Sequence, residues 1–461
     1  MKRMVYAHFI GVGGAGMSGL ARVLHDRGNR VSGSDLKESR YTRALVESGI
    51  PVSIGHHADN LGDPEVVVVS SAIPESNPEL AAARTRGLDI WPRARMLAHL
   101  AGERTTIAVA GTHGKTTTSS MVATMLSGLG LDPTFLVGGE VCAYGTNAAC
   151  GTGRHYVVEA DESDGSFIYL DPFISLLTNV EADHLDHYGT LAAVEETFQQ
   201  FVAKTAAAGC VVVCGDDPRA MDIARRSGVQ MVTYGRGHEC DVRCDSLEAA
   251  GRGYRFSFTL PTGVRVHASI AVPGEHNVIN ATGALAVAHV LGVDVQAAAD
   301  ALAEFRGVKR RFDEVGLVGG VTVVDDYAHH PTEVRATLAA ARSLGYRRVW
   351  AVFQPHRYSR TAALGEEFGC AFDDADAVVM MDVYSAGETP IPGVTGKTIV
   401  DAILDQDNRP RVAYFPHRRE VVPYVSGRAR AGDLVLTLGA GDVTALGPQI
   451  VEALGVERGS G

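Results

Sequence analysis

Short apolar runs rich in β-branched residues alternate with Ala- and Leu-rich stretches along nearly the whole chain of 461 residues. A buried strand followed by a helix of about ten or more residues is typical of a βαβ unit, and such units build parallel sheets with helices on both faces. The pattern therefore predicts an α/β fold with mostly parallel sheets. The predicted strands are Met4–Ile10, Val66–Val69, Thr106–Ala110, Tyr156–Glu159, Ile174–Val180, Val211–Cys214, Val321–Asp325, Arg348–Phe353 and Leu434–Leu438.

Two further features concern the organisation of the chain. Tyr254–Leu260 and Val264–Ile270 flank a Pro-Thr-Gly turn, which predicts an antiparallel hairpin in the middle region. The length suggests about three domains, and a strand followed by a glycine turn occurs three times, at Gly11, Gly111 and Gly439. Boundaries near residues 103 and 308 give each turn its own domain, so the predicted domains are 1–102, 103–307 and 308–461.

The charge balance limits the classes of partner. The chain has 54 acidic residues against 42 lysines and arginines, a formal net charge of −12. This acidity disfavours non-specific binding to nucleic acid or to an anionic membrane, but it leaves room for a local basic pocket around a phosphorylated small molecule. We expect small-molecule substrates, no nucleic acid and no membrane. The expected oligomeric state is a monomer or a weak homodimer.

Several features favour the cytoplasm. The longest apolar stretch, Ala281–Val293, is interrupted by two glycines and a histidine, and it is shorter than the roughly 18 residues that a spanning helix needs. Lys2 and Arg3 before an apolar run only faintly resemble a signal peptide, because a glycine cluster follows at once. Seven cysteines, an odd number spread thinly, fit reduced thiols.

The first glycine turn indicates a diphosphate site. Gly11-Val12-Gly13-Gly14-Ala15-Gly16 follows a predicted strand and precedes a helix-like segment, Met17–His25. In this setting the missing Cβ atoms let a pyrophosphate approach backbone N–H groups at a helix N-terminus. Arg30–Ser34 is a second predicted strand and ends at Asp35, where an acid commonly binds a ribose hydroxyl. From these residues alone, NAD and a UDP-sugar are equal candidates.

The second glycine turn is a phosphate loop. Thr106–Ala110 leads into GTHGKTTT at 111–118, and a helix-like segment follows. In such a loop successive N–H groups surround the β-phosphate, the lysine reaches the β- and γ-phosphate oxygens, and the next hydroxyl binds Mg²⁺. The general form would need glycine at Val109, so this is the shorter G-x-x-G-K-T variant. The predicted ATP contacts here are Gly111, Thr112, His113, Gly114, Lys115, Thr116 and Thr117.

Acidic residues follow two neighbouring strands. Tyr156–Glu159 ends in a carboxylate suited to the magnesium side of the site, and Ile174–Val180 leads into EADHLDH at 181–187. The carboxyl ends of strands are where α/β sheets bind ligands. A solvated turn or helix start explains Asp186 and His187 equally well.

Eight ordered motifs together resemble the Mur ligases, the ATP-dependent amino-acid ligases of peptidoglycan synthesis. The motifs are GVGGAGMSGLA at 11–21, GTHGKTTT at 111–118, EADESDGSF at 159–167, NVEADHLDHY at 179–188, GEHNVINA at 274–281, RRFDEVG at 310–316, DDYAHHPTEV at 325–334 and QPHRYSRT at 354–361. They occur in order along nearly the whole chain, which disfavours a chance similarity.

The resemblance implies a fold and an activity. It implies a Rossmann-like N-terminal domain for a UDP-sugar, a central P-loop ATPase domain and a Rossmann-like C-terminal domain for the amino acid. It decides the first glycine turn in favour of UDP over NAD. The implied reaction is ATP-dependent ligation of L-alanine to the carboxylate of UDP-N-acetylmuramate through an acyl phosphate. We expect Mg²⁺ as a cofactor, with two ions, and a role in cell-wall biogenesis and hence in cell shape and division.

The resemblance also implies roles for individual residues. The UDP-sugar set is Gly13, Gly14, Ala15, Gly16, Asp35, Ser70 and Arg93. The further nucleotide contacts are His276, Asn277, Asn280, Arg311 and Asp326. The metal ligands are Thr116 and Glu159, with His184 at a second ion. His329, Arg357 and Arg360 are expected near the sugar–peptide end and the incoming alanine, so the catalytic set is Lys115, His184, His329, Arg357 and Arg360.

One departure from the family concerns the second metal. Several Mur ligases use a carbamylated lysine there, whereas the matching stretch here, Glu195–Phe201, contains no lysine and Lys204 is too far along the chain.

Three rival functions stay open from the sequence. An NAD-dependent oxidoreductase explains Gly11–Asp35 but leaves the phosphate loop unused. A nucleotide-dependent switch protein explains the phosphate loop but not DDYAHHPTEV at 325–334. Within the family, a recycling ligase that attaches a preformed tripeptide shares GTHGKTTT.

Overall fold

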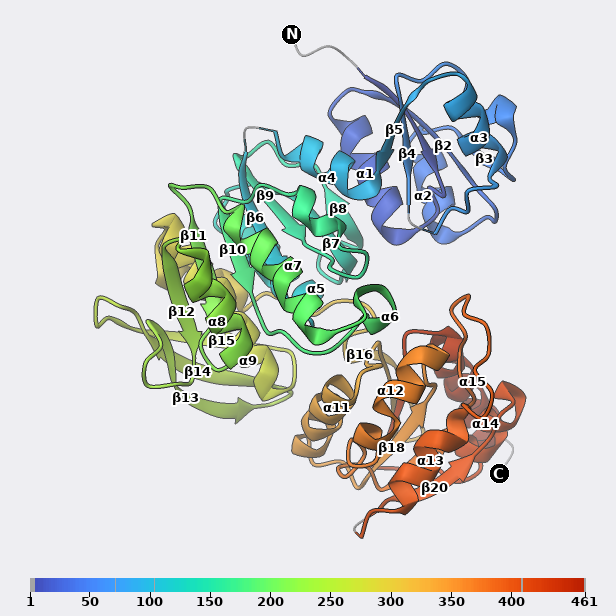
Figure 1. Cartoon of the computed structure of the whole chain (residues 1–461). Coiled ribbons are helices and arrows are strands. Elements are labelled where there is room, and N and C mark those ends of the chain that lie inside the picture. Colours follow the sequence, from blue (N-terminus) through green and yellow to red (C-terminus); the bar gives the residue numbers. More distant parts are fainter. Residues whose placement is uncertain (1–4, 71, 103, 408, 460–461) are drawn as a thin grey trace. The chain divides into compact units, whose positions relative to one another are not determined.

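The computed structural model describes residues 5–459, apart from Ser71, Glu103 and Asn408 (Figure 1). Met4, in the first predicted strand, and Glu103, at the first predicted boundary, lie outside the described residues. The described chain forms three mostly parallel sheets with accompanying helices, which confirms the predicted α/β class. No described helix combines the length and the apolar character needed to cross a bilayer.

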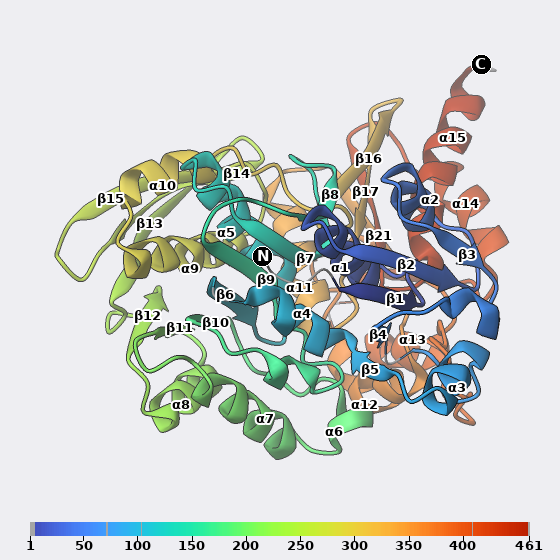
Figure 2. The same cartoon turned by 90° about the horizontal axis from the view of Figure 1, so that it is seen from above.

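The first sheet has five parallel strands in the order β3-β2-β1-β4-β5. Its central strand β1 (Tyr6–Ile10) is buried from its second residue onward, because helices cover both faces. Helix α1 (Ala15–Asp26) also lies beside β7 and β8 of the next sheet (Figure 2). The remaining elements are β2 (Arg30–Asp35), α2 (Arg40–Glu47), β3 (Val52–Ile54), η1 (Ala58–Leu61), β4 (Val66–Val69), α3 (Pro78–Thr85), β5 (Asp89–Pro92) and α4 (Arg93–Ala101).

The second sheet has ten strands in the order β15-β14-β13-β12-β11-β10-β6-β9-β7-β8. Strand β6 (Thr105–Ala110) lies between β10 (Ile174–Leu177) and β9 (His155–Glu159), and both pairings are parallel. The turn after β6 therefore sits between the carboxyl ends of the two strands that precede the acidic motifs. The other strands are β7 (Thr134–Val141), β8 (Thr146–Ala149), β11 (Cys210–Cys214), β12 (Met231–Gly235), β13 (Val242–Ala250), β14 (Gly253–Thr259) and β15 (Arg265–Ile270).

The predicted hairpin is confirmed, since β14 and β15 are neighbours joined by one short turn, in which the Leu260 N–H donates to the Val264 carbonyl. Strand β13 extends this part of the sheet and was not predicted. The helices are α5 (Lys115–Gly128), η2 (Ser166–Tyr169), α6 (Leu185–Tyr188), α7 (Leu191–Ala203), α8 (Pro218–Ser227), α9 (Glu275–Leu291) and α10 (Val295–Leu302).

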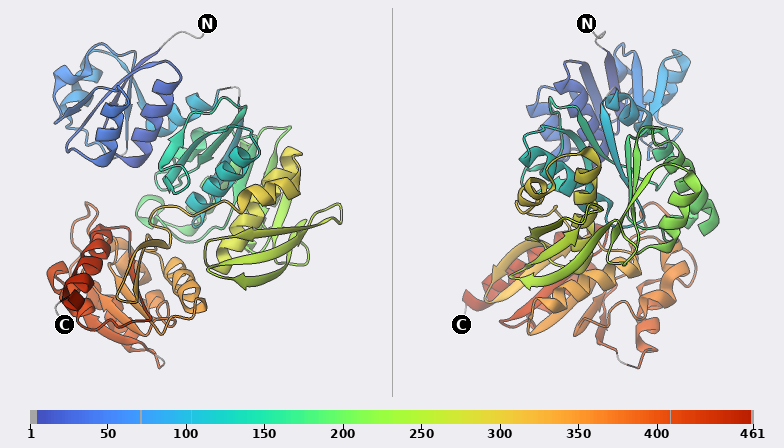
Figure 3. Two further views of the ribbon diagram at one scale, coloured as in Figure 1. Left: turned by 180° about the vertical axis from the view of Figure 1, so that it is seen from behind. Right: turned by 90° about the vertical axis from the view of Figure 1, so that its left-hand side faces the viewer.

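The third sheet has six strands in the order β16-β17-β21-β18-β19-β20, and only the β16–β17 pair is antiparallel. Helices α11–α13 lie on one face of this sheet and α14 and α15 on the other (Figure 3). A separate apolar core lies under each of these two groups of helices. The elements are β16 (Asp313–Val318), β17 (Val321–Asp326), α11 (Pro331–Ser343), β18 (Arg348–Phe353), α12 (Tyr358–Phe368), β19 (Ala377–Met380), α13 (Gly396–Leu404), β20 (Arg411–Tyr414), α14 (Arg418–Ser426), β21 (Asp433–Leu438), η3 (Asp442–Ala445) and α15 (Leu446–Gly459).

The chain divides into two compact units. The first contains the residues up to Leu247 together with Phe256–Ser269 and Ile279–Phe305. The second contains Glu248–Arg255, Ile270–Val278 and the residues from Arg306 onward. The first two sheets thus belong to the first unit, except for the ends of β13, β14 and β15, and the third sheet belongs to the second unit.

Candidate active site

The phosphate loop connects β6 to α5 and depends on two glycines. Gly111 has φ +134°, and a Cβ there would lie 2.0 Å from the Thr178 hydroxyl oxygen. Gly114 has φ +81°, and a Cβ there would lie 2.8 Å from the Asn280 amide oxygen. Both positions therefore require glycine for conformation and for space. Asn280, a predicted nucleotide contact, lies directly against this loop.

Lys115 begins α5 and its side chain folds back across the loop. Its Nζ donates to the carbonyl oxygens of Gly111 at 2.7 Å and Thr112 at 2.9 Å, and to Glu162 Oε1 at 2.8 Å. Burial lowers the pKa of Lys115, but the negative charges of nearby carboxylates, Glu162 first, outweigh it and raise the pKa above its ordinary value. Lys115 is therefore a fixed positive charge at the loop.

The carboxyl end of β9 places an acid beside Thr116. Glu159 Oε1 accepts a hydrogen bond from the Thr116 hydroxyl at 3.0 Å, and Oε2 accepts one from the Gly138 N–H at 2.6 Å. A Cβ on Gly138 would lie only 2.6 Å from the same carboxylate, so glycine is required for this close approach. A hydroxyl and a carboxylate side by side are hard oxygen donors of the kind that Mg²⁺ prefers, so the residues present fit a magnesium ion.

Two further acids in the same segment were not assigned from the sequence. Glu162 is 2% exposed; burial and the neighbouring Asp161 raise the pKa of its carboxyl, although Lys115 opposes them. Asp161 pairs with Arg93 at 3.2 Å and so connects the phosphate-loop acids to a predicted UDP-sugar residue. Burial raises the pKa of Asp161, but Arg93 and Lys115 outweigh it and lower the pKa. The sequence signal was present as the acid cluster EADES directly after β9.

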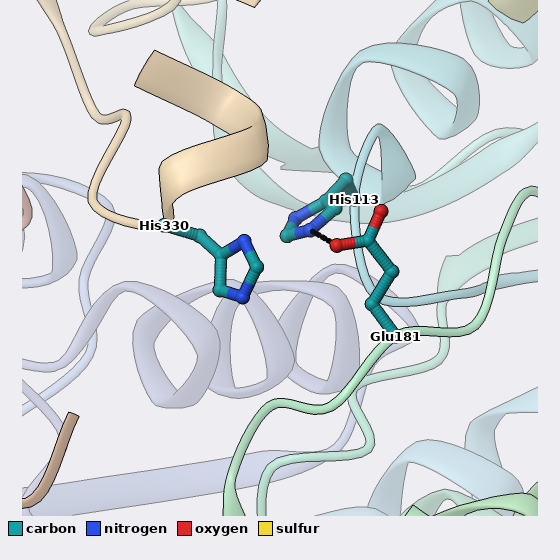
Figure 4. A group of neighbouring side chains, drawn as sticks. All are labelled: His113, Glu181 and His330. Atoms are coloured by element: carbon teal, nitrogen blue, oxygen red, sulfur yellow. Dashed lines mark ion pairs between the residues drawn. The ribbon is translucent and has the colours of Figure 1, made fainter. Parts of the chain in front are cut away.

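The segment after β10 forms hydrogen bonds with the phosphate loop. The Asn179 amide oxygen accepts the His113 N–H at 2.8 Å, and the Thr112 hydroxyl accepts the Glu181 N–H at 2.8 Å. His113 Nε2 lies 3.5 Å from Glu181 Oε2, as the dashed line in Figure 4 shows. Strand β10 ends at Leu177 and not at the predicted Val180. The side chains of Thr178 and Asn179, which follow it, donate to the His113 carbonyl of the loop at 2.7 and 3.1 Å.

His184 also follows β10, where the sequence placed it. It has φ +53°, its N–H donates to Asp183 Oδ1 at 2.7 Å, and its Nε2 lies 3.6 Å from Asp183 Oδ2. A positive φ at a non-glycine residue costs energy and is commonly found at functional sites. Lys204 is held elsewhere, by Asp171 at 3.0 Å and the Ile168 carbonyl at 2.5 Å, so it is committed to a different contact.

The predicted UDP-sugar residues converge on the first glycine turn. The Gly13 N–H donates to Asp35 Oδ2 at 2.8 Å. A Cβ on Gly16 would lie 2.7 Å from a guanidinium nitrogen of Arg93, and a Cβ on Gly11 would lie 3.7 Å from the Ser70 hydroxyl oxygen. Gly14 is the N-cap of α1, which begins at Ala15. The turn therefore combines N–H groups at a helix N-terminus with one guanidinium, which suits a diphosphate.

A buried polar network lies behind this turn and was not predicted. Both carboxylate oxygens of Glu79, which is 0% exposed, accept hydrogen bonds. Ser34 Oγ and Asn60 Nδ2 donate at 2.5 and 2.8 Å, and His8 Nε2 lies 3.1 Å away. The Ser34 carbonyl in turn accepts the Gly11 N–H at 2.8 Å and the Val12 N–H at 2.9 Å. Glu79 therefore holds Ser34, whose carbonyl oxygen binds the glycine turn.

In the second unit, a charged group surrounds the end of β17. Asp326 Oδ2 accepts the Phe312 N–H at 2.7 Å, and Arg311 lies 3.7 Å from Glu333 Oε1. Burial raises the pKa of Asp326 to about 6, against the opposing charge of Arg311. Burial and the same guanidinium lower the pKa of His276 to about 4. Three predicted nucleotide contacts, Arg311, Asp326 and His276, are therefore electrostatically coupled within this unit.

A second group in this unit contains histidines and arginines. His329 Nδ1 lies 2.9 Å from the Tyr327 carbonyl and 3.3 Å from Glu333 Oε2. The His329 and His356 ring centroids are 5.7 Å apart, and an Arg360 guanidinium nitrogen lies 3.4 Å from His356 Nδ1. His356 connects two predicted residues and was not itself predicted as a site residue.

Arg357 stands in a strained backbone position at the N-cap of α12. Its φ is +70°, its N–H donates to the Tyr384 carbonyl at 2.8 Å, and its guanidinium lies 3.7 Å from Glu388 Oε1. Such a conformation is costly for an arginine and persists where surrounding contacts enforce it. Of the remaining predicted contacts, Thr117 lies in the first turn of α5 and Asn277 Nδ2 donates to the Pro273 carbonyl at 2.7 Å.

Three family models match the chain in order. They are the Mur ligase family catalytic domain over residues 6–105, the Mur ligase middle domain over 109–288, and the Mur ligase glutamate ligase domain over 310–441.

Known proteins align over almost the full length. The UDP-N-acetylmuramate–L-alanine ligase of Thermobifida fusca is 48% identical, with 97% of this chain and 96% of that protein covered. The same-named protein of Rubrobacter xylanophilus is 50% identical, with 97% and 99% covered. The crystal structure of UDP-N-acetylmuramate–alanine ligase from Thermotoga maritima has a TM-score of 0.81 at 30% identity, with 99% and 100% covered. The chain therefore belongs to the Mur ligase family.

Proposed function

We propose that this chain is an ATP-dependent ligase that joins L-alanine to the carboxylate of UDP-N-acetylmuramate in peptidoglycan precursor synthesis. The observation that carries the proposal is its 48–50% identity, over nearly the full length, to proteins named for this reaction. The geometry supports it, because the first unit has one diphosphate-type turn in each of its two sheets. An NAD-dependent oxidoreductase would leave the phosphate loop and its lysine without a role.

In the first step, a carboxylate oxygen of the sugar attacks the γ-phosphorus of ATP, the bond to the β-phosphate breaks, and ADP leaves. Repulsion between the two anions is the main obstacle, so positive charge and N–H donors at the loop lower the barrier. Lys115 and the N-terminus of α5 supply both. A Mg²⁺ ion held by Thr116 and Glu159 would add positive charge at the phosphates, and we propose His184 as a ligand of a second ion.

In the second step, the alanine amine attacks the acyl carbon and phosphate leaves, while the amine loses a proton. His329 is our candidate for the acceptor. Its Nδ1 faces two oxygen acceptors, the Tyr327 carbonyl and Glu333 Oε2, which favours the tautomer with the proton on Nδ1. Nε2 is then the basic nitrogen, and it can take the proton from the amine.

A ligation assay tests the function. The purified protein is incubated with UDP-N-acetylmuramate, ATP and Mg²⁺, and with L-alanine, glycine, L-serine or a cell-wall tripeptide in parallel, and product mass and phosphate release are measured. We expect the highest kcat/KM with L-alanine. A higher kcat/KM with the tripeptide would assign the chain to the recycling ligases of the family, and phosphate release without any amino acid would favour a nucleotide-dependent switch.

We propose that Arg357 binds the alanine carboxylate, because a guanidinium can form two parallel hydrogen bonds with a carboxylate. Arg357→Ala is expected to raise the KM for alanine at least about tenfold, the usual cost of one charge-assisted contact, and to change the KM for ATP little. Steady-state kinetics with each substrate varied in turn measures both. Arg335→Ala, which removes an exposed arginine of α11, is the control. Equal increases in both KM values would show that Arg357 does not bind the alanine carboxylate.

The remaining assignments extend this proposal. We propose the division of labour 1–102 for the UDP-sugar, 103–307 for ATP and 308–461 for the amino acid. We also propose that the protein is a monomer or a weak homodimer. The proposed compartment is the cytoplasm, because the seven cysteines are free thiols.

A further inference from the structure

A cavity outside the proposed catalytic groups opens at the amino-terminal edge of the third sheet. It has a volume of about 430 Å³. Arg348 and Arg411, which line it, are the first residues of β18 and β20. Asp326 ends β17, and Arg357 follows the end of β18. In parallel strands these positions belong to opposite edges of the sheet, so the cavity is separate from the residues proposed for catalysis.

The cavity is lined by five arginines. They are Arg347, Arg348, Arg411, Arg428 and Arg430, and none of the described residues that line the cavity is acidic. This concentration of positive charge occurs in a chain of net charge −12. Like charges gathered in one place repel one another, and the repulsion is relieved when an anion binds between them.

A buried carboxylate holds the side chains of two of these arginines in place. Asp433, which is 0% exposed, accepts hydrogen bonds from Arg347 Nε at 3.1 Å and Arg348 Nη2 at 2.6 Å. It also accepts the Trp350 indole N–H at 3.2 Å and the Arg430 backbone N–H at 2.9 Å. One carboxylate therefore anchors two guanidiniums and balances the charge of only one of them.

Two of the other arginines, Arg428 and Arg430, are oriented by neutral groups. The Arg428 guanidinium lies 4.1 Å from the centre of the Tyr424 ring, and Arg430 Nη1 donates to the carbonyls of Gly427 and Ala429 at 3.0 and 2.9 Å. These contacts orient the two guanidiniums but do not neutralise their positive charge. Five arginines line the cavity, whereas the carboxylates next to them are the buried Asp433 and Asp376, which acts on Arg348, so positive charge exceeds negative charge there.

We propose that this arginine cavity binds a small polyphosphate anion, such as a diphosphate group. Guanidiniums match phosphate oxygens in charge and in paired hydrogen-bond geometry. A volume of about 430 Å³ is in the range of small-molecule sites, and the acidity of the whole chain disfavours a polyanionic polymer.

Pyrophosphate titration tests the proposal. The probe is inorganic pyrophosphate without Mg²⁺, added in a calorimeter to the Lys115→Ala protein saturated with UDP-N-acetylmuramate, in which the first glycine turn is occupied and the phosphate loop is weakened. Arg411→Ser together with Arg430→Ser is then introduced, because neither side chain holds Asp433 and no buried carboxylate is left unpaired. We expect the Kd for pyrophosphate to rise at least about tenfold, the equivalent of one charge-assisted hydrogen bond.

The control removes a positive charge elsewhere on the same sheet domain. Arg419→Ser, at an exposed arginine of α14 that does not line the cavity, should leave the Kd within about twofold. Equal affinities in all three proteins would overturn the proposal. Displacement of pyrophosphate by ADP would identify a nucleotide as the source of the phosphate, and displacement by phosphate alone a free anion.

Two further measurements complete the test. In phosphate-free buffer the double variant should melt at the same or a higher temperature, because repulsion is reduced; a Tm lower by about 5 °C or more would show that these arginines support the fold and would overturn the proposal. A short acidic peptide that binds the cavity where pyrophosphate does not would also overturn it and assign the surface to an acidic protein.

Discussion

Lys115→Ala is expected to lower the rate of ATP turnover about 10³-fold or more, while UDP-N-acetylmuramate still binds. The magnitude follows from removing one fixed positive charge at transferring phosphate, which typically costs this much in rate. Lys115 bonds to two carbonyls of the phosphate loop and to Glu162, so its loss affects the loop and not the first glycine turn. Turnover is measured as ADP release, and sugar binding by calorimetric titration.

The control for this variant must separate chemistry from folding. Removing Lys115 leaves Glu162 buried without its partner cation, but burial already raises the pKa of that carboxyl, so it can take up a proton at modest cost. Lys204→Ala is the matched variant, since Lys204 pairs with the exposed Asp171, and it should keep wild-type turnover. Loss of both turnover and sugar binding in a folded Lys115→Ala protein would contradict separate sites for the two substrates.

The elements that were predicted well are those set by local pattern. The strands Val66–Val69 and Arg348–Phe353 have the predicted bounds because an uninterrupted apolar run in a parallel sheet is buried on both faces. The glycine turns at Gly11 and Gly111 were found because a positive φ and a close approach demand glycine at fixed spacing from a strand and a helix.

The features that were missed depend on contacts between residues distant in sequence. Glu79 meets His8 across 71 residues, and Lys115 meets Glu162 across 47. The local sequence of Glu79 does not differ from that of an exposed residue at a helix start, so composition and periodicity give no signal there. Glu162 stands in the acid cluster EADES, but the local pattern does not show which of these acids meets Lys115. The contact between Gly138 and Glu159 was missed for the same reason, because it is the pairing of β7 with β9 that brings the two residues together.

The Glu79 network leads to the largest expected change in stability. Glu79→Ala removes a buried carboxylate and with it an acceptor for His8, Ser34 and Asn60, of which Asn60 Nδ2 keeps the Gly55 carbonyl at 3.0 Å. Leaving a buried donor without its acceptor typically costs about 1–3 kcal/mol, so the loss of several such bonds is expected to lower the unfolding free energy by about 3 kcal/mol or more. Because the Ser34 carbonyl holds the N–H groups of Gly11 and Val12, we also expect weaker binding of UDP-N-acetylmuramate. Urea unfolding and calorimetric titration at pH 7 measure the two effects. Glu75→Ala, at an exposed glutamate, should change both little.

The pH dependence of stability distinguishes the charge of Glu79 from its shape. Burial raises the pKa of its carboxyl, but hydrogen bonds from His8, Ser34 and Asn60 outweigh burial and bring the pKa from 4.5 to about 2. Because the folded-state pKa is the lower one, this stabilisation is complete above pH 4.5 and is lost as the pH falls toward 2. Between pH 6 and pH 3.5 the wild-type protein should therefore lose more unfolding free energy than Glu79→Ala, and the two curves should converge. Parallel curves would mean that the carboxylate charge contributes nothing, and the network would then act only through packing.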